Sequence, residues 1–283
     1  MGTQPGNVTA LQALSPAKIN LFLHVTGRRA DGYHSLQTVF QLLDWGDDMR
    51  FEHRDQPGIT LSGDTDDIPR ADNLIIKAAE ALNHDEHGAH IHIRKRLPRG
   101  GGLGGGSSNA ATTLLALNRL WQLGLPQSSL LEIAEPLGAD VPVFVLGQNA
   151  WAEGTGEVLT PLTLPKRWYV IVQPECEVST AEIFAQPELT RHTVPITVQA
   201  FFSGAGSNDL QAVVLSRYPE VKQAWEWLYQ QSPTACMTGS GACLFAALET
   251  REEAEHIAAI APEGLKVDVA AGLDKLPPMQ EVA

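Results

Sequence analysis

The chain has 283 residues, 43% of them hydrophobic and 19% charged, and this length favours two domains over a single core. Its 33 acidic and 20 basic residues give a formal net charge of −13, which argues against a general nucleic-acid binder or a protein that binds anionic membranes. A local basic patch would therefore stand out against this background.

The cysteines and the N-terminus bear on the compartment. Cys176, Cys236 and Cys243 are odd in number and lack metal-ligand spacing, so we interpret them as reduced thiols of a cytoplasmic protein. The first dozen residues lack the basic region and apolar core of a signal peptide, and no later apolar run approaches the ~18 residues of a membrane span. We expect no membrane segment, and we interpret the first dozen residues as an extension.

The first predicted element is a strand over 15–27, SPAKINLFLHVTG, in which apolar and polar residues alternate. One face carries five apolar residues: Ala17, Ile19, Leu21, Leu23 and Val25. The opposite face carries Lys18 and Asn20 together with Phe22, and that aromatic side chain favours a covered face over a solvated one. A covered lysine needs an anionic partner, so Lys18 is a candidate functional residue.

A turn at Asp31 and Gly32 leads to a second predicted strand over 34–43. Tyr33 and His34 project from its start, where they could either stack on the flat ring of a ligand or form an edge of the core. The segment DWGDD after this strand predicts a turn, and two further strands and a helix capped by Asp72 follow it.

Histidines and basic residues gather before the middle of the chain. The histidines fall on a predicted helix end, a turn and a strand, which favours a solvated loop over a metal site; they are His84, His87, His90 and His92. The basic residues directly precede a glycine-rich loop and are Arg94, Lys95, Arg96 and Arg99. In an acidic protein this cluster indicates local attraction for a polyanion, or else an ordinary exposed strand end.

The most distinctive stretch is PRGGGLGGGSSNAAT at 98–112, in which six glycines are interrupted only by Leu103. Glycine allows positive φ angles and lets backbone N–H groups approach a ligand closely. Ser107 or Ser108 is expected at the N-cap of the following helix, whose free amides and dipole would face the loop. The loop therefore predicts an anion site suited to a phosphate chain.

Two better-known phosphate motifs do not match this loop. A P-loop would continue with Gly-Lys-Ser/Thr, and a dinucleotide fingerprint would need G-x-G-x-x-G spacing with an acidic residue about 20 positions further on. A flexible glycine linker is the remaining alternative, but a linker rarely has a basic strand before it and a helix after it.

Asp140 lies between a predicted helix and the apolar run 141–145. Such a residue is usually a cap or turn residue, and a functional role depends on whether it faces the loop and Lys18. A hairpin turning at 154–156 closes the first half, and we place the domain boundary after it, giving domains at 1–161 and 162–283. The second half alternates strands and helices and predicts a compact α+β layer with helices on one face.

Three stretches in this order resemble the GHMP kinase superfamily: SPAKINLFL at 15–23, PRGGGLGGGSSNAAT at 98–112 and MTGSGACLFA at 237–246. RADGYH at 29–34 and LGADVPVF at 137–144 are similar to the branch whose substrate is a cytidine diphosphate-linked methylerythritol. The resemblance implies an α+β fold of two domains, an N-terminal layer like domain 2 of ribosomal protein S5 and a C-terminal ferredoxin-like α/β sandwich. ATP and substrate would bind in the cleft between them.

The resemblance also implies the reaction. The γ-phosphoryl group of ATP would move to the 2-hydroxyl of the methylerythritol part, with Asp140 as general base and Lys18 as its electrostatic partner. Such a transfer needs mainly alignment and charge neutralisation from the protein. Mg²⁺ would accompany ATP, with Ser107 or Ser108 as its protein ligand.

Binding residues follow from the same resemblance. The implied ATP-binding residues are Lys95, Pro98, Arg99, Gly100, Gly101, Gly102, Leu103, Gly104, Gly105, Gly106, Ser107 and Ser108. The cytosine would be held by Tyr33, His34 and Phe184. The rest of the substrate would contact Asn20, Thr180, Thr238 and Gly239.

Two other functions stay open at this point. Another GHMP kinase would act on homoserine, mevalonate or a sugar, but the aromatic clamp suits a nucleobase better than an aliphatic alcohol. A nucleotide-binding or RNA-binding relative without turnover would not need both Lys18 and Asp140. The expected partners are ATP and a small molecule, without nucleic acid or membrane, and the expected assembly is a monomer or a weak homodimer.

Overall fold

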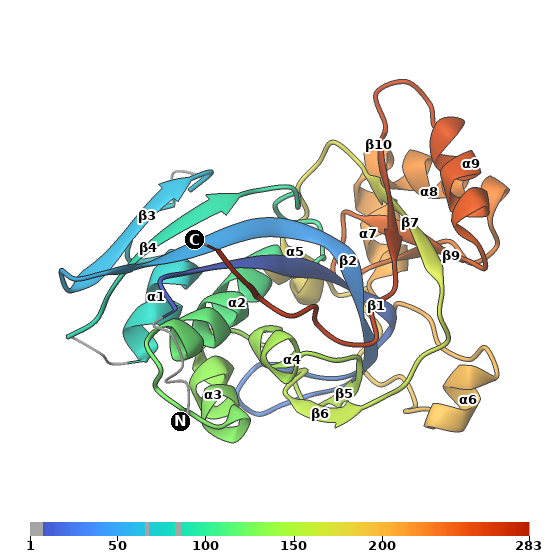
Figure 1. Ribbon diagram of the computed structural model, residues 1–283. Coiled ribbons are helices and arrows are strands. Elements are labelled where there is room, and N and C mark those ends of the chain that lie inside the picture. The colour runs from blue at the N-terminus through green and yellow to red at the C-terminus, as the bar shows by residue number, and fades with distance from the viewer. Residues whose placement is uncertain (1–7, 66–67, 83–85, 283) are drawn as a thin grey trace.

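The computed structural model describes residues 8–65, 68–82 and 86–282, and this part of the chain forms two sheets, each with its own helices (Figure 1). The larger sheet has the order β11-β1-β2-β4-β3, with β5 and β6 attached to β2. Its strands are β1 (Ala10–Arg28), β2 (His34–Arg54), β3 (Gly58–Gly63), β4 (Gly88–Arg94), β5 (Ala150–Glu153), β6 (Val158–Pro161) and β11 (Gln280–Glu281). The smaller sheet has the order β10-β7-β9-β8 and consists of β7 (Trp168–Gln173), β8 (Cys236–Met237), β9 (Leu244–Leu248) and β10 (Lys266–Ala271).

Strands β1 and β2 form one long antiparallel hairpin. Its turn contains Gly32 with a φ of 91°, as the Asp-Gly pair in the sequence predicts. The register shifts three times along the pair, and two of these shifts flank Lys18 and Asn20. Such bulges bend a strand pair and re-aim its side chains, so the hairpin is irregular where β1 carries its polar residues.

The predicted turn at DWGDD is wrong, because β2 runs through this segment without a break. Asp47 pairs with Ser15, and Gly46 pairs with Pro16 across the hairpin. A Cβ on Gly46 would overlap the carbonyl oxygen of Ser15, so this glycine permits the close approach of two strands. Cross-strand pairing therefore outweighs the local turn preference of Gly and Asp.

Helices cover one face of the larger sheet (Figure 1): α1 (Leu74–Ala81), α2 (Gly105–Leu120), α3 (Gln127–Ala134) and α4 (Val141–Leu146), with a 3₁₀ turn at Glu135–Leu137. The core between them includes Phe51 of β2, Leu114 of α2 and Phe144 of α4. Helix α1 is capped by Asn73, whose side chain accepts from the Ile75 amide. The predicted cap at Asp72 is therefore one residue too early.

The smaller sheet lies between its own helices and the larger sheet. Val170 and Val172 pack with the helices α5 (Thr180–Ala185), α7 (Gln211–Arg217), α8 (Pro219–Gln231) and α9 (Arg251–Ala259). Tyr169 and Ile171 belong instead to a cluster with Ala17 of β1. This alternation is the two-residue period of a strand, and the predicted layer with helices on one face is confirmed.

In the second half of the chain, one local prediction is confirmed, and the predicted domain boundary stays a prediction. Thr250 and Glu253 form a reciprocal capping box at the start of α9, which confirms the prediction from their spacing. The chain then returns to the larger sheet, where β11 pairs with β1. The predicted boundary after residue 161 falls in the connection between β6 and β7 and stays a prediction.

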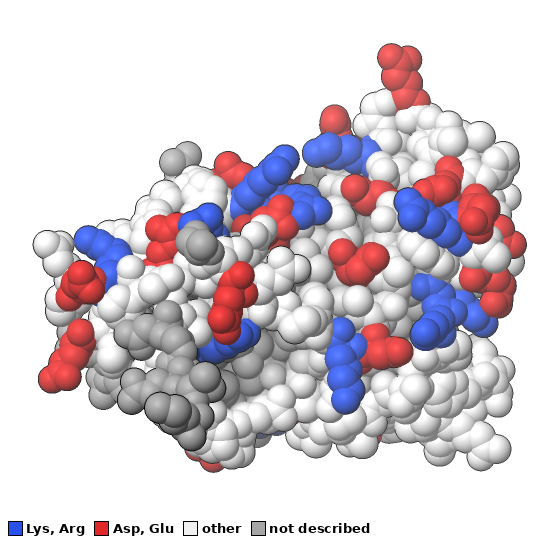
Figure 2. Space-filling view, viewed as in Figure 1, with Lys and Arg blue, Asp and Glu red and all other residues white. Residues whose placement is uncertain are grey.

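Within the described ranges, no helix is both long enough and apolar enough to cross a bilayer. On the face seen in Figure 2, basic and acidic side chains lie next to one another. Ion pairs between solvent-accessible side chains, such as Arg167 with Glu249 at 2.8 Å, occur in the structure. The visible charge is therefore mixed in sign rather than gathered by sign.

Candidate active site

The glycine-rich loop connects β4 to α2 and has a backbone that other residues would strain. Gly100, Gly102 and Gly104 have φ angles of 60°, 72° and 72°, in the left-handed region that favours glycine. A Cβ on Gly102 would also overlap the carbonyl oxygen of Thr238. The loop is therefore clamped against the turn between β8 and β9, and Gly102 is the point of contact.

Helix α2 begins earlier than the sequence analysis predicts. Its N-cap is Gly104, and Ser107 and Ser108 lie inside the first turn, so the predicted serine cap is wrong. The left-handed Gly104 ends the loop and lets the helix start at once. Ser108 is fully buried and accepts a hydrogen bond from the Ser15 hydroxyl at 2.8 Å, whereas Ser107 lines two pockets.

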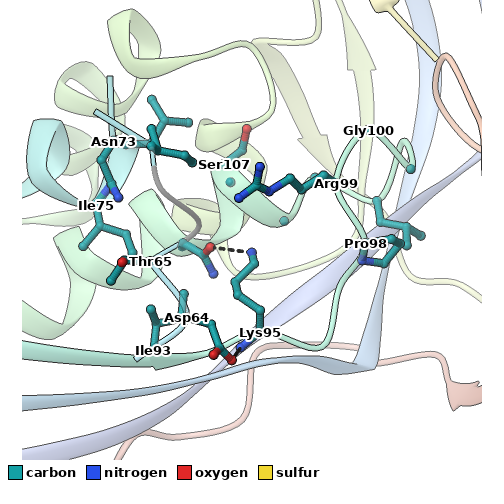
Figure 3. A pocket seen from close by; sticks show the side chains of 18 of the residues that line it. Asp64, Thr65, Asn73, Ile75, Ile93, Lys95, Pro98, Arg99, Gly100 and Ser107 are labelled. Carbon is teal, nitrogen blue, oxygen red and sulfur yellow. Dashed lines mark hydrogen bonds between the residues drawn. The ribbon is translucent and has the colours of Figure 1, made fainter. Parts of the chain in front are cut away.

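The first pocket, of about 440 Å³, lies between the loop, the start of α1 and the end of β4. Figure 3 shows the side chains of Lys95 and Arg99 extending into it, with Asn73 and Thr65 on its other walls. Lys95 Nζ donates to Asn109 Oδ1 at 3.1 Å and to Asp47 Oδ2 at 2.6 Å. Lys95, held in place by these two bonds, therefore lines the pocket together with the glycine-rich loop and the start of α1.

At least two members of the basic cluster before the loop form ion pairs. Lys95 pairs with Asp47, and Arg96 pairs with Asp48. Because two of the four positive charges are offset in this way, general electrostatic attraction is weaker than the sequence alone suggests. Lys95 and Arg99 are the members of the cluster that line the pocket.

A second pocket, of about 690 Å³, lies on the other side of the loop. Six of the seven residues predicted to bind the acceptor line it, together with Lys18 and Asp140: Asn20, Tyr33, His34, Thr180, Phe184 and Gly239. The seventh, Thr238, is fully buried and does not line the pocket. Both pockets are lined by Gly100, Gly102, Gly104 and Ser107. The loop is thus a shared wall, and ligands in the two pockets would meet across it.

Lys18 and Asp140 form a partly buried ion pair at this wall. Lys18 is only 3% exposed, and its Nζ lies 3.2 Å from Asp140 Oδ2. Lys18 Nζ also donates to Asn20 Oδ1 at 2.7 Å and to the carbonyl of Gly102 at 3.0 Å. The prediction that a covered Lys18 has an anionic partner is confirmed. Asp140 stands at the N-cap of α4 and faces the loop and Lys18. It therefore meets the condition on which a functional role depends.

The turn between β8 and β9 completes the wall from the second half. The Thr238 hydroxyl donates to the carbonyl of Gly102 at 3.2 Å and accepts from the Asn20 amide at 3.0 Å. The hydroxyls of Thr180 and Ser240 share a hydrogen bond at 2.6 Å. The three segments that carried the sequence resemblance therefore meet at one place.

An aromatic pair lies at the far end of the second pocket. The rings of His34 and Phe184 stack with centroids 4.9 Å apart and planes 29° apart, while Tyr33 is 68% exposed at the rim. Burial, followed by the charges of Arg191 and Arg28, lowers the pKa of His34 below its usual value of 6.5. The sequence left open whether Tyr33 and His34 face a ligand or the core, and both line the pocket.

Other residues considered in the sequence analysis make contacts that stabilise the fold. Leu103 is buried, and its carbonyl accepts from the Lys18 amide at 3.0 Å. His90 and His92 bond to the Ser62 hydroxyl, and His84 lies outside the described residues. In the ranges that the structure describes, no group of three or more His, Cys, Asp or Glu side chains could hold a metal ion.

Sequence reasoning missed several residues around the two pockets. Asp47 is fully buried and accepts from the Arg96 and Leu97 amides, the Lys95 ammonium and the Asn109 amide group. It was hidden in the segment interpreted as a turn. Asn109 stands directly after the two serines of the loop, so its position was a signal. Arg191 lies in an irregular connection and gave none.

The comparisons with known proteins agree with this fold and site. The model of the GHMP kinases N terminal domain matches residues 73–148, and the model of the GHMP kinases C terminal domain matches residues 197–267. The loop lies in the first match, and the turn that clamps it lies in the second. Fold and site together define a two-domain GHMP kinase, and the predicted fold class is confirmed.

More specific similarity comes from curated relatives. A 4-diphosphocytidyl-2-C-methyl-D-erythritol kinase of Nitrosospira multiformis is 50% identical, covering 97% of this chain and 95% of the relative. One of Marinobacter nauticus is 51% identical, covering 95% of this chain and 96% of the relative. A crystal structure of a 4-(cytidine 5'-diphospho)-2C-methyl-D-erythritol kinase matches with a TM-score of 0.76 and 33% identity, covering 92% of this chain and 99% of that one. The chain belongs to the 4-diphosphocytidyl-2-C-methyl-D-erythritol kinase family. The predicted enzyme class, a small-molecule kinase, is thereby confirmed, and membership implies the use of ATP.

Proposed function

We propose that this chain transfers the γ-phosphoryl group of ATP to the 2-hydroxyl of 4-diphosphocytidyl-2-C-methyl-D-erythritol. One observation carries the proposal: the partly buried ion pair of Lys18 and Asp140 stands at a glycine wall shared by two pockets. A kinase of this kind must hold a nucleotide and an acceptor in line across one phosphoryl group. The names of relatives about 50% identical to this chain support the choice of acceptor.

In this proposal the first pocket receives ATP. The phosphate chain would lie on the loop and the N-terminus of α2, where free amides and the helix dipole favour negative charge. Lys95 and Arg99, whose side chains extend into this pocket, would add positive charge. Mg²⁺ would supply charge neutralisation on the phosphates, and its protein ligand would be Ser107, because Ser108 is buried and bonded to Ser15. A single hydroxyl suits an ion that prefers phosphate oxygens and water.

The second pocket would receive the acceptor. Asp140 would align the 2-hydroxyl and accept its proton, while Lys18 would hold the carboxylate and face the group in transfer. Lys18 is itself fixed by Asn20 and Gly102, so its ammonium needs little reorganisation during the reaction. Asp140 therefore acts through orientation as much as through proton abstraction.

Specificity would lie away from the loop. The cytosine would bind at Tyr33, His34 and Phe184, where stacked rings suit a flat base better than an aliphatic alcohol. Thr180 and Gly239 would close the acceptor pocket from the second half of the chain. Thr238, which is fully buried, would support the glycine loop through its hydrogen bond to Gly102.

We also propose domains at 1–161 and 162–283, a cytoplasmic enzyme, and a monomer or weak homodimer. The three cysteines support the reducing compartment, since all are free thiols. Burial raises the pKa of Cys236 to about 11 and that of Cys243 to about 12, which keeps both groups in the unreactive thiol form.

A coupled assay of ADP release tests the proposal. The chain is offered 4-diphosphocytidyl-2-C-methyl-D-erythritol, homoserine or mevalonate with ATP and Mg²⁺. We expect rapid turnover with the first and background rates with the other two. No turnover with the first, together with clear turnover of either alternative, would overturn the assignment.

A further inference from the structure

Arg191 holds the aromatic pair of the acceptor pocket from behind. It lies in the connection between α5 and α6 (Val198–Phe202), and its Nε–H donates to His34 Nε2 at 3.2 Å. Its terminal N–H groups donate to three backbone carbonyls: Phe184 at 2.8 Å, Gln186 at 2.5 Å and Leu189 at 3.0 Å. One guanidinium thus bonds to the imidazole and to the backbone that carries its stacking partner.

The orientation of Arg191 is set by the backbone rather than by His34. The guanidinium is planar and rigid, so the three carbonyl contacts also fix the direction of the Nε–H. These carbonyls come from the end of α5 and the residues after it. His34 must therefore adapt to the donor that Arg191 presents.

That donor decides where the proton of His34 lies. An arginine has no acceptor and stays protonated, so the Nε2 atom facing it must offer a lone pair. The proton of the neutral imidazole is then on Nδ1. A second proton on Nε2 would face the Arg191 Nε–H directly, and the hydrogen bond would be lost.

We propose that Arg191 is a positioning residue that holds His34 as the neutral Nδ1–H tautomer, stacked on Phe184. This end of the pocket then offers an uncharged ring and one hydrogen-bond donor, which suits a flat base with a ring or carbonyl acceptor. The cytosine of the acceptor has both kinds of acceptor. That choice of ligand rests on the proposed function, whereas the tautomer does not.

The charges around His34 agree with a neutral ring. Arg28 pairs with His34 across the hairpin and adds a second positive charge. Arg29 and Asp31 in the turn pair with each other at 2.9 Å. Glu153 of β5 accepts from Gln37 at 3.1 Å, and Glu182 of α5 is exposed to solvent. The charges that act on the pKa of His34 are those of Arg191 and Arg28, and both are positive.

The tautomer can be measured on the full chain without any ligand. Correlated ¹³C and ¹⁵N spectra of the imidazoles, with His34 assigned by its loss in His34→Gln, should show the Nδ1–H form. In Arg191→Gln we expect a mixture of tautomers and a higher pKa of His34. Arg191→Lys keeps the positive charge but loses the planar guanidinium that bonds to several acceptors at once. We therefore expect a mixture of His34 tautomers, with a smaller rise in the pKa of His34 than in Arg191→Gln. An Nε2–H form in the parent chain would overturn the proposal.

Kinetics give a second readout. We expect both Arg191 variants to raise the KM of the cytidylyl acceptor about tenfold, the size of one lost hydrogen bond, while the KM of ATP stays within about twofold. In Arg191→Gln the loss in kcat/KM should grow below pH 6.5, because a larger fraction of His34 is protonated there. The matched control is Arg50→Gln, on an exposed arginine of β2.

The two proposals fail in different ways. An unchanged acceptor KM in both variants, with an unchanged His34 tautomer, would overturn the role of Arg191. If the parent chain does not turn over this acceptor at all, the proposed function fails, and the spectra of His34 still decide the role of Arg191.

Discussion

At the scale of single residues, the site depends on charges that are buried and tightly bonded. Lys18 reaches Asp140, Asn20 and Gly102, and Asp47 accepts four hydrogen bonds beneath the first pocket. Groups held in this way need little rearrangement when charge moves during a reaction. Substitutions that keep the shape but change the hydrogen bonding should therefore be informative.

Asp140→Asn keeps the shape of the side chain but removes its charge and basicity. We expect kcat to fall by about two orders of magnitude or more, the range for a lost general base, while ATP still binds. Steady-state ADP release and equilibrium binding of a fluorescent ATP analogue measure the two effects. Asp55→Asn, on a fully exposed side chain, should leave both unchanged. Activity within a few-fold of the parent would contradict the role of Asp140.

Asp47→Asn replaces one of the two carboxylate oxygens with an NH₂ group, which cannot accept hydrogen bonds from the surrounding donors. Four N–H groups converge on the carboxylate, so an amide must place its own N–H against at least one of them. We expect a loss of about 1–3 kcal/mol in the free energy of unfolding and a higher KM for ATP, because Lys95 loses its anchor. Asp48→Asn is the matched control on the neighbouring residue, half-exposed and paired with Arg96, and should cost at most about 1 kcal/mol. Equal losses would show that burial of Asp47 has no special role.

At the scale of elements, the decisive feature is the contact between the glycine loop and the turn after β8. Gly102→Ala should displace this contact, because its Cβ would overlap the carbonyl of Thr238. Gly124→Ala provides a control with a φ of 66° and, among the described residues, no atom within 4 Å of the added Cβ. Both changes carry the left-handed strain of about 1–2 kcal/mol. We expect only Gly102→Ala to lower kcat/KM for ATP by about tenfold or more, and equal effects would contradict the clamp.

The elements that sequence could predict are those encoded locally. The strand around Lys18 with its covered polar face, the Asp-Gly turn before Tyr33 and the capping box of Thr250 and Glu253 all depend on neighbouring residues, and the structure contains each of them. The predicted turn at DWGDD failed because Gly46 serves a partner strand about 30 positions away. The serine cap failed because Gly104 starts the helix by its own conformation.

The residues of the candidate site also divide into those that a local sequence pattern identifies and those that it does not. Lys18, Asp140 and the glycines were identified from their patterns, and the fold brings them together. Asp47 and Arg191 could not be identified, because each acts through contacts with residues far away in the sequence: Asp47 with residues 95–97 and Asn109, and Arg191 with His34. A carboxylate with four donors from two other segments, residues 95–97 and Asn109, has no signature in its own neighbourhood.

At the scale of the whole molecule, the two halves meet along β1, and a histidine lies at that junction. His24 is 5% exposed, its Nε2 accepts from the Ser207 amide at 3.3 Å, and among the described residues its Nδ1 finds no partner. Burial lowers the pKa of His24 below 6.5, although Asp209 opposes this shift. Protonation therefore favours the unfolded chain, in which the imidazole is free to take up a proton.

The sign of the pH effect follows from this shift. Above pH 6.5 the contribution of neutral His24 is fully present, and it is lost as the pH falls from 6.5 toward its lower folded-state pKa. We expect the free energy of unfolding to fall between pH 7 and pH 5, and His24→Gln to reduce that slope in urea titrations. His256→Gln, on an exposed position of α9, is the control. An equal slope in the parent chain and His24→Gln would contradict the assignment.

The central claim is that one phosphoryl group crosses the glycine wall from ATP to the acceptor hydroxyl beside Asp140. It is tested most directly by ³¹P NMR of the products made from ATP and 4-diphosphocytidyl-2-C-methyl-D-erythritol. The account predicts ADP and, in equal amount, a new phosphomonoester on the 2-oxygen of the methylerythritol part, with Asp140→Asn forming it at least about a hundredfold more slowly. ADP with free phosphate alone, or a phosphomonoester on another oxygen, would contradict it.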